Sequence, residues 1–378
     1  MTFERILAVK LADFGDALLM TPALRALRAA YPGATIDALT TPGAADVYRH
    51  SGLVDEVLVF DKARYDGPGG WLRAPLVPFV LGRRLRARRY GAVALFHHLT
   101  TRAGAVKHAG LVLASGAPAR AGLARPGAAR AAFLNRRAAD LGYDARHEVE
   151  AALAVAAALG APAKDRSLAF VPGARAEARA TALLATLDAG GPWVALHPGS
   201  GPYSPARRWL PERFAEVADG LAASGARVVL VGTPADGTAD VAAQARAPVL
   251  DLTGRTDLPT LAAVLARMDL FVGNDSGVTH LATAMGTPVV AVFGPSNAIA
   301  WGPWWPETDA QGPPSPHRVV GLPLPCRPCM YRGHALGEPR GCPTRDCLTW
   351  LPSGRVLEAA LDALARAGRS STRLRAES

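Results

Sequence analysis

The chain has 378 residues, 49% hydrophobic and 20% charged, which is the composition of a soluble globular protein and too much chain for one ordinary core. No N-terminal signal and no apolar stretch of bilayer-spanning length are visible, so the sequence predicts a cytoplasmic protein and excludes an integral membrane one. All four cysteines lie between Cys326 and Cys347, which excludes a disulfide framework spread over the fold.

Charge is divided unevenly along the chain. Residues 1–185 hold 25 Lys and Arg against 15 Asp and Glu, a net charge of +10, whereas residues 186–378 hold 17 of each kind. This uneven distribution of charge indicates that the N-terminal half has an anionic partner. The candidate partners are an acceptor substrate, a membrane surface and a nucleic acid. The densest basic run, residues 81–90, is more typical of a solvated helix face.

The N-terminal half begins with a predicted strand at Ile6–Lys10, a loop that ends at Asp16 and a helix at Ala17–Tyr31. Further short apolar runs, separated by helical segments, occur at residues 35–39, 57–60 and 92–96. This alternation predicts a parallel sheet of Rossmann type. Two more helices are expected near residues 130–141 and 148–159.

A linker is predicted around Val171–Gly173, and a second alternation starts after it, with strands at residues 193–196, 227–231, 249–252, 270–272 and 289–293. The predicted domains are residues 1–172 and 173–351, followed at 352–378 by a C-terminal helix that returns toward the N-terminal domain and then a flexible tail. Two Rossmann-like halves predict a cleft between them. The first strand is not followed by a GxGxxG motif, so a dinucleotide site is not indicated.

Leu270–Pro295 is the most informative stretch, because a strand, a polar turn, a helix and a second strand follow one another within it. The turn Gly273–Gly277 contains residues that favour helix N-caps. A helix that starts at the carboxyl end of a parallel strand presents free N–H groups and suits a pyrophosphate. The alternative is a plain β-α turn in which Asp275 or Ser276 only caps the helix.

Five motifs occur in one order: VKLADFGDALLMTPALRAL, LHPGS with RRWLPERF, VGTPAD, GNDSGVTHLATAMGTPVVAVFGP and a cysteine cluster before the last helix. Together they resemble the bacterial ADP-heptose:lipopolysaccharide heptosyltransferases, glycosyltransferase family nine, over nearly the whole chain. The resemblance implies the α/β GT-B fold, with two Rossmann-like domains whose parallel sheets face a central cleft. It also implies inverting transfer of a sugar from a nucleotide-sugar donor.

By this resemblance, Asp16 matches the proposed catalytic base, which takes the proton of the acceptor hydroxyl. A helix N-cap is its alternative role, and both roles are compatible. Asp275, Ser276, Gly277 and His280 match the donor-binding Asp-(Ser/Thr)-Gly-x-x-His. The Ser276 hydroxyl and the backbone after it are expected to face the pyrophosphate, and Asp275 is expected to accept from sugar hydroxyls.

The turn after the first strand of the second half resembles a family turn that approaches the donor, and His197, Gly199 and Ser200 are assigned to it. Arg207 stands where the family usually has Lys in a Lys-x-Trp-Pro element, as the cation that stabilises the diphosphate leaving group. Arg208 is the competing candidate for that cation.

Three further donor-binding residues are carried over from the same resemblance. Asp236 lies near the family's acidic residue that accepts from the nucleotide ribose, and it is shorter than the usual Glu. Thr253 and Gly254 are expected to line the adenine pocket through their backbone.

The four cysteines Cys326, Cys329, Cys342 and Cys347 form two closely spaced pairs, which suit a tetrahedral structural metal, iron or zinc. Members of the family related to autotransporter heptosyltransferases carry a similar iron element. The alternative is reduced thiols or incidental disulfides. No metal is expected in the chemistry itself.

The sequence thus predicts transfer of a heptose or related sugar from an ADP-sugar, with ADP-heptose favoured, to an anionic or glycan acceptor on the basic N-terminal domain. Lipopolysaccharide or another cell-surface glycan is the expected product, with peripheral contact at the inner membrane surface. The first alternative is another nucleotide-sugar, or a protein or small-molecule acceptor. The second alternative is a non-catalytic basic protein that binds nucleic acid or a membrane surface. This chain lacks the aromatic residues that proteins binding single-stranded nucleic acid place between their basic residues, so nucleic acid is not expected.

Overall fold

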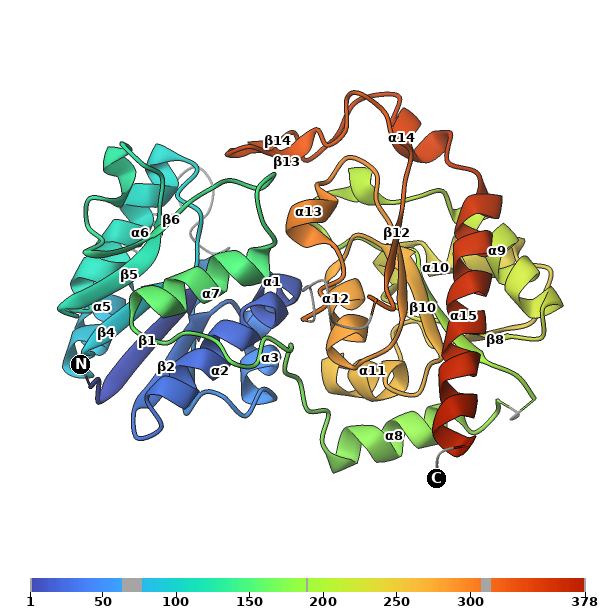
Figure 1. The fold of residues 1–378 in the computed structure, drawn as a ribbon, viewed down its shortest axis with the longest axis horizontal. Coiled ribbons are helices and arrows are strands. Elements are labelled where there is room, and N and C mark those ends of the chain that lie inside the picture. The colour runs from blue at the N-terminus through green and yellow to red at the C-terminus, as the bar shows by residue number, and fades with distance from the viewer. Residues whose placement is uncertain (1, 63–76, 188–189, 307–313, 377–378) are drawn as a thin grey trace. The chain divides into compact units, whose positions relative to one another are not determined.

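The computed structural model describes residues 2–62, 77–187, 190–306 and 314–376, and the chain divides into two compact units, Met1–Ala169 and Phe170–Ser378 (Figure 1). The predicted linker around Val171–Gly173 lies beside this division. In both units the central strands are short, largely aliphatic runs that are buried on both faces, as parallel sheets covered by helices require.

The N-terminal unit contains a six-stranded parallel sheet of order β3-β2-β1-β4-β5-β6, the Rossmann order. Its strands are β1 (Arg5–Lys10), β2 (Thr35–Thr40), β3 (Glu56–Val59), β4 (Ala92–Leu95), β5 (Ala119–Ala124) and β6 (Arg136–Ala139). Its helices are α1 (Phe14–Leu19), α2 (Thr21–Ala30), α3 (Ala45–Arg49), α5 (Val77–Ala87), α6 (Arg102–Ala114) and α7 (Glu148–Ala158), with 3-10 turns η1 (Pro42–Ala44) and η3 (Ala129–Ala131).

The C-terminal unit repeats this order as β12-β11-β10-β7-β8-β9, again parallel throughout. Its strands are β7 (Trp193–His197), β8 (Arg227–Leu230), β9 (Val249–Asp251), β10 (Leu270–Asn274), β11 (Val289–Val292) and β12 (Arg318–Val320), with a hairpin of β13 (Met330–Arg332) and β14 (Ala335–Gly337). Its helices are α8 (Ala174–Leu184), α9 (Pro211–Ala223), α10 (Thr238–Gln244), α11 (Leu258–Leu265), α12 (Gly277–Ala284), α13 (Ala298–Trp301), α14 (Asp346–Thr349) and α15 (Ser353–Ala376), with 3-10 turns η4 (Pro205–Arg207) and η5 (Pro234–Asp236). The predicted pair of Rossmann-like units is confirmed.

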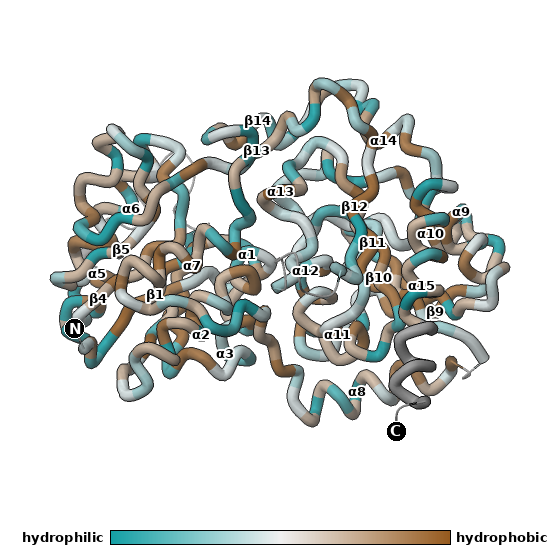
Figure 2. Tube along the Cα trace, in the orientation of Figure 1, coloured by the Kyte–Doolittle hydropathy of each residue, from teal (hydrophilic) through white to brown (hydrophobic). Residues whose placement is uncertain are grey.

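The hydrophobic cores lie on the sheets, and the central strands of both units are among the brown segments of Figure 2. In the C-terminal unit, Trp209 is 1% exposed and packs edge-on against Phe214, with its indole N–H donating to the Leu351 carbonyl over 3.2 Å. This contact fixes the segment between β7 and α9, which carries the predicted leaving-group arginines.

Two expectations about the N-terminal unit are wrong. The segment at residues 130–141 was expected to be helical but contains η3 and β6, because pairing with β5 outweighs the helix propensity of its Ala and Arg residues. The first helix begins at Phe14 and not after Asp16, and its N-cap residue is Asp13. Asp16 therefore lies inside the first turn and is not the N-cap.

Helix α15 lies along the sheet of the C-terminal unit, beside α9 (Figure 1). Val356, Ala360 and Ala363 recur at helical spacing and belong to the hydrophobic core of that unit. This apolar face is used by the helix's own unit, and the expected return of the helix toward the N-terminal domain stays a prediction. It continues to Ala376, so of the expected flexible tail only residues 377–378 lie outside the described residues. Among the helices that the structure describes, none has the length and apolar character needed to cross a bilayer.

Candidate functional site

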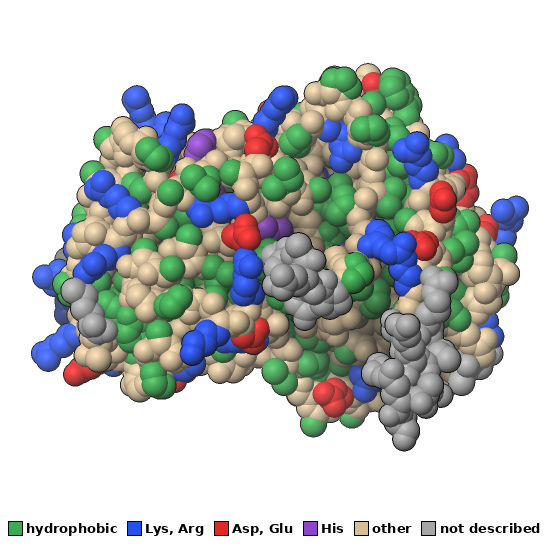
Figure 3. Space-filling model, viewed as in Figure 1, with side chains coloured by type: hydrophobic (Ala, Val, Ile, Leu, Met, Phe, Trp, Pro, Cys, Tyr) green, Lys and Arg blue, Asp and Glu red, His purple; other side chains and the backbone are tan. Residues whose placement is uncertain are grey.

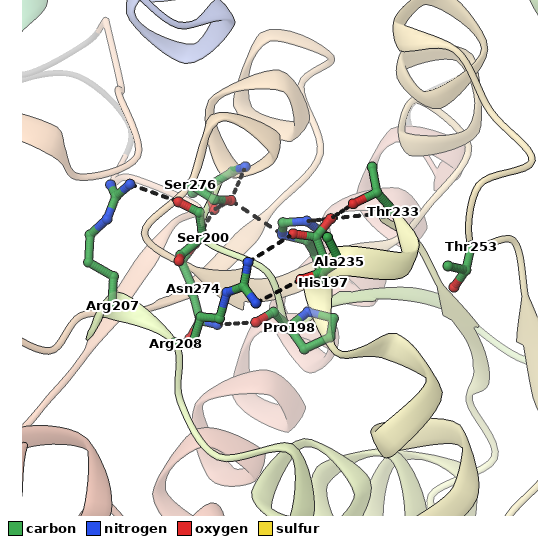
Figure 4. Close-up of polar contacts among 12 residues, drawn as sticks. His197, Pro198, Ser200, Arg207, Arg208, Thr233, Ala235, Thr253, Asn274 and Ser276 are labelled. Atoms are coloured by element: carbon green, nitrogen blue, oxygen red, sulfur yellow. Dashed lines mark hydrogen bonds and ion pairs between the residues drawn. The ribbon is translucent and has the colours of Figure 1, made fainter. Parts of the chain in front are cut away.

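The candidate site lies at the carboxyl ends of β7 and β10, which are neighbours in the middle of the C-terminal sheet. The chain runs outward from β7 to β8 and β9, and in the other direction from β10 to β11 and β12. Open α/β sheets bind ligands at such a reversal of strand order, outside the carboxyl ends of the strands. The polar residues that follow these strands are drawn in Figure 4.

Helix α12 starts at this edge directly after β10, as predicted. Ser276 is its N-cap, and its hydroxyl oxygen accepts from the Thr279 N–H over 3.4 Å. The Thr279 hydroxyl donates to the carbonyl of Asn274, the last residue of β10, over 2.6 Å. His280 lies inside the helix and is only 4% exposed. The helix N-terminus, with its positive dipole end, can hold an anionic group.

Asn274 organises the edge, although sequence reasoning assigned it no role. Its side-chain N–H donates to the Pro198 carbonyl over 2.7 Å (Figure 4). Its side-chain oxygen accepts from the Trp209 N–H over 3.1 Å. The side chain is fully buried and joins the turn after β7 to the segment before α9. Its position in the polar turn after a buried strand is the signal that could have identified it.

The two arginines of the leaving-group element point to different partners (Figure 4). Arg207 donates to Asp275 over 3.1 Å and to the Ser200 carbonyl over 2.7 Å, which places its guanidinium beside the start of α12. Arg208 donates to the Ala235 carbonyl over 2.7 Å and lies 3.7 Å from the Asp236 carboxylate. Of the two candidates, Arg207 is therefore the one that the structure brings to the predicted anion site.

Asp275 is buried beside Arg207. Its side chain is 3% exposed and forms an ion pair with Arg207, and its contact with sugar hydroxyls stays a prediction. The pair holds the guanidinium in place. The Ser200 hydroxyl is also used internally, since it donates to the Ser204 carbonyl over 2.9 Å.

Asp236 is held by its own turn. Its carboxylate accepts from the Thr233 N–H and the Thr233 hydroxyl, both over 2.8 Å, in a capping box. A Cβ at Gly199 would lie 2.1 Å from this carboxylate, so only glycine at that position leaves room for Asp236. Burial raises the Asp236 pKa, but the His197 imidazole and the Thr233 donors outweigh burial and hold the pKa well below its usual range. The predicted ribose acceptor is therefore a buried, ionised carboxylate that already has partners.

Thr253 and Gly254 lie at the end of β9, and Figure 4 shows Thr253 apart from the other labelled side chains. The Thr253 N–H donates to the Asp251 carboxylate over 2.9 Å. Gly254 has a φ of +67° and donates its N–H to the Gly232 carbonyl over 2.9 Å. The left-handed backbone explains the glycine at this position, and the adenine contact stays a prediction.

In the N-terminal unit, Asp16 lies on α1 after β1, and β1 and β4 mark the reversal of strand order in that sheet. Its carboxylate is 3.0 Å from the ammonium of Lys10, whose side chain is 8% exposed. Burial lowers the Lys10 pKa, but Asp16 and Glu148 raise it by more, so the net shift is upward and Lys10 stays charged. Lys10 was missed, although a charged residue at the end of a buried strand is an informative signal.

A second buried charge cluster continues from Glu148. His98 follows β4 and lies 3.0 Å from Asp140 and 2.9 Å from Glu148, and all three side chains are less than 10% exposed. Burial lowers the His98 pKa, but the two carboxylates outweigh it and raise the pKa to about 9. Positive and negative groups therefore alternate from Asp16 through Lys10, Glu148 and His98 to Asp140. Within this series, the ion pair with Lys10 is the contact that holds the Asp16 carboxylate.

On the face of the N-terminal unit that Figure 3 shows, basic residues do not gather in one patch. In Figure 3, blue Lys and Arg side chains are scattered over the face of this unit that is shown. Within the basic run, Arg88 is used internally, because it forms ion pairs with Asp37 and Glu56 over 2.9 Å and 2.5 Å. A dispersed field suits attraction of an anionic substrate better than tracking of a nucleic-acid backbone.

The cysteine segment is held by contacts with the rest of its unit. The described residues contain no group of three or more His, Cys, Asp or Glu side chains placed to hold a metal ion, and Cys326, Cys329, Cys342 and Cys347 are free thiols. The Arg327 guanidinium donates to the carbonyls of Phe293, Gly294 and Leu322. Met330 is fully buried, and Cys347 is 5% exposed within the core. The structure therefore gives no support to the metal site that the cysteine spacing predicts.

Comparison with known proteins gives a consistent result. The family model described as Glycosyltransferase family 9 (heptosyltransferase) matches residues 79–319. Lipopolysaccharide heptosyltransferase 3 of Escherichia coli K12 is 39% identical over 101 residues, which cover 25% of this chain and 29% of that protein. The matched segment thus spans less than a third of that relative.

Two solved structures align over nearly the full length of the chain. A glycosyl transferase family 9 protein from Veillonella parvula has a TM-score of 0.72 and 23% identity, covering 97% of this chain and 98% of that one. The E. coli heptosyltransferase WaaC with ADP has a TM-score of 0.64 and 22% identity, covering 95% and 99%. At these identities the similarity concerns the fold, and it confirms the predicted GT-B class.

Proposed function

Because the chain belongs to glycosyltransferase family 9, we propose that it is an inverting transferase that moves a heptose from ADP-heptose to an acceptor hydroxyl of lipopolysaccharide or another surface glycan. The observation that carries the proposal is the anion site at the β7–β10 reversal, where the start of α12 and the Arg207 guanidinium lie together. Similar proteins include lipopolysaccharide heptosyltransferase 3 and a heptosyltransferase solved with ADP, which supports an ADP-sugar donor.

In the proposed reaction, the acceptor oxygen attacks the anomeric carbon of the donor while Asp16 takes the hydroxyl proton. The bond between that carbon and the diphosphate oxygen breaks, and ADP leaves with the bonding electron pair. Arg207 and the free N–H groups at the start of α12 stabilise the charge that grows on the diphosphate. Gly277 and His280 remain proposed donor contacts, as do the backbone of His197, Gly199 and Ser200 and that of Thr253 and Gly254.

The acceptor is assigned to the N-terminal unit, which carries the basic excess and Asp16. A lipopolysaccharide acceptor is anchored in a membrane, so the proposed reaction takes place at a membrane surface. We assign it to the cytoplasmic face of that membrane. The scattered basic residues would attract an anionic acceptor through a long-range field.

A ligand screen tests the donor assignment. We expect ADP-heptose to raise the thermal unfolding temperature more than ADP alone, because the sugar adds contacts and ligand binding stabilises the folded state. UDP-sugars and GDP-sugars serve as controls at the same concentration. Greater stabilisation by one of these controls would contradict the ADP-heptose assignment.

Chelation tests the expectation that chemistry needs no metal, since Arg207 and α12 supply positive charge at the diphosphate. Transfer is expected to be undiminished in excess EDTA. A strict requirement for added Mg²⁺ or Mn²⁺ would contradict the expectation of metal-independent chemistry.

Metal analysis of the same sample tests the cysteines separately. About one equivalent of iron or zinc would support a structural metal there, whereas four titratable thiols without metal would exclude it.

A further inference from the structure

Helix α6 of the N-terminal unit is apolar on its outer face as well as on its inner face. Ala105 and Val112 belong to the hydrophobic core beneath the helix. On the outer face Val106 is 72% exposed and Leu113 is 51% exposed, and the exposed Gly110 lies between them at helical spacing. A surface helix ordinarily presents polar side chains to water, whereas a helix that is apolar all round is ordinarily covered. The outer face of α6 therefore indicates a partner.

Helix α5 extends this apolar face. It packs beside α6 (Figure 1), and a Cβ at Gly82 of α5 would lie 3.2 Å from the Ala114 Cβ of α6. Val80, two residues before Gly82, is 60% exposed, and Leu113 directly precedes Ala114. Val80 and Leu113 therefore both lie within one helical turn of the point at which the two helices touch.

Basic residues flank the exposed aliphatic ones. Arg83 lies three residues after Val80, and Arg102 lies four residues before Val106, so each shares a helix face with an exposed valine. Lys107 is also exposed and follows Val106 directly. We call these exposed residues the α5–α6 surface: Val80, Arg83, Arg102, Val106, Lys107 and Leu113.

Charge on this part of the chain has one sign. No Asp or Glu occurs between Asp66 and Asp140, a stretch that holds 13 Lys and Arg. Glu56 of β3 reaches α5 from outside this stretch, and its carboxylate lies 3.7 Å from Arg84 and 2.5 Å from Arg88. Those two arginines do not belong to the α5–α6 surface, which therefore joins aliphatic side chains to positive charge.

Helix α6 also begins at the edge of the sheet that carries Asp16. It follows β4, Asp16 follows β1, and the strand order reverses between these two strands. The His108 ring of α6 lies 4.4 Å from the His97 ring, measured between centroids. Nε2 of His97 accepts from the Leu11 N–H over 2.7 Å, in the loop that leads to Asp16. A bilayer in contact with the outer face of α6 would therefore lie close to the proposed base.

We propose that the α5–α6 surface docks this protein onto an anionic membrane. The three aliphatic side chains enter the interfacial layer of the bilayer, and the three basic ones contact its head-group phosphates. The inference rests on the proposed function, because an acceptor that is anchored in a membrane requires the enzyme to reach that membrane.

Two other occupants fit the surface less well. In a symmetric pair of copies the same surface faces itself, so the basic residues of one copy would meet those of the other. Proteins that bind single-stranded nucleic acid place aromatic side chains among their basic residues, whereas this surface has aliphatic ones. Anionic head groups over an apolar layer complement both the charge and the aliphatic side chains.

Sedimentation of the full chain with lipid vesicles tests the docking without donor or acceptor. The probes are vesicles of equal parts phosphatidylglycerol and phosphatidylcholine, and vesicles of phosphatidylcholine alone are the uncharged reference. Wild-type protein is expected to bind the reference about a hundredfold more weakly, at about fivefold for each basic residue near the surface. High salt should weaken binding to the anionic vesicles, because it screens the attraction.

Two double variants and a matched control locate the binding surface, and each is checked for wild-type-like thermal unfolding. Val106→Gln/Leu113→Gln keeps good helix formers and should lower vesicle binding by about tenfold, because two apolar side chains are lost from the contact. Arg83→Gln/Arg102→Gln should lower it by about twenty-five-fold and reduce its salt dependence. The control Val171→Gln/Ile299→Gln removes two exposed apolar residues of the C-terminal unit and should bind like wild type.

The outcomes are distinguishable from failure of the proposed function. The docking surface is overturned if wild-type protein does not bind anionic vesicles, or if the two double variants bind no more weakly than the control. A dimer in analytical ultracentrifugation that Val106→Gln/Leu113→Gln dissociates would also overturn it, because a second copy then covers the surface. None of these results changes the donor assignment, which depends on stabilisation by ADP-heptose. Vesicle binding at this surface by a protein that ADP-heptose does not stabilise would support the docking and contradict the donor assignment.

Discussion

Replacing Asp16 by asparagine is expected to lower transfer by about a hundredfold to ten-thousandfold, which is the typical contribution of a general base. Asparagine keeps the size and polarity of the side chain but cannot take the acceptor proton. Donor affinity should be nearly unchanged, because Asp16 belongs to the N-terminal unit and the proposed donor contacts belong to the C-terminal one. Steady-state kinetics on the acceptor, with calorimetric donor binding, measure the two quantities separately.

Asp13→Asn is the matched control for this variant. Asp13 is exposed and is the N-cap residue of α1, a position at which asparagine is as favourable as aspartate. Its transfer rate and thermal stability should stay close to wild type. Wild-type turnover by Asp16→Asn would remove Asp16 from the mechanism, and a large loss in Asp13→Asn would indicate that the base is Asp13.

Replacing Arg207 by alanine is expected to lower kcat by about a hundredfold to a thousandfold, the range found when one preorganised donor to a developing charge is removed. KM for the donor should change less, because the charge on the departing diphosphate grows toward the transition state. The same change leaves the buried Asp275 without its ion-pair partner, so stability must be measured alongside.

Two companion variants make the result specific. Arg207→Lys keeps a positive charge, as in the family element, and should recover much of kcat, whereas a purely steric role would not be rescued. Arg208→Ala removes the neighbouring cation, whose contacts are with Ala235 and Asp236, and should cost far less turnover. If Arg208→Ala is the damaging change and Arg207→Ala is silent, the leaving-group cation is Arg208.

Local signals in the sequence were sufficient to predict the fold class and the strand-turn-helix that leads into α12. The alternation of apolar runs and helical segments predicts two parallel sheets, since strands and helices of this kind are specified by residue spacing. The turn from Gly273 to Gly277 predicted the start of α12 within one residue. Composition misled where Ala and Arg residues favour a helix, in the segment that forms the edge strand β6.

The sequence by itself therefore determined the fold class, the strand-turn-helix at Ser276 and the candidate pair of arginines. Only the tertiary structure decided which groups meet. Arg207 and Asp275 are 68 positions apart, and His197 and Ser276 are 79 apart. They come together because β7 and β10 are adjacent in the sheet, and spacing along the chain does not specify strand order. The contacts of the cysteine segment are likewise decided in three dimensions, since Arg327 and Met330 bind the carbonyls of Phe293 and Pro295 in the loop after β11.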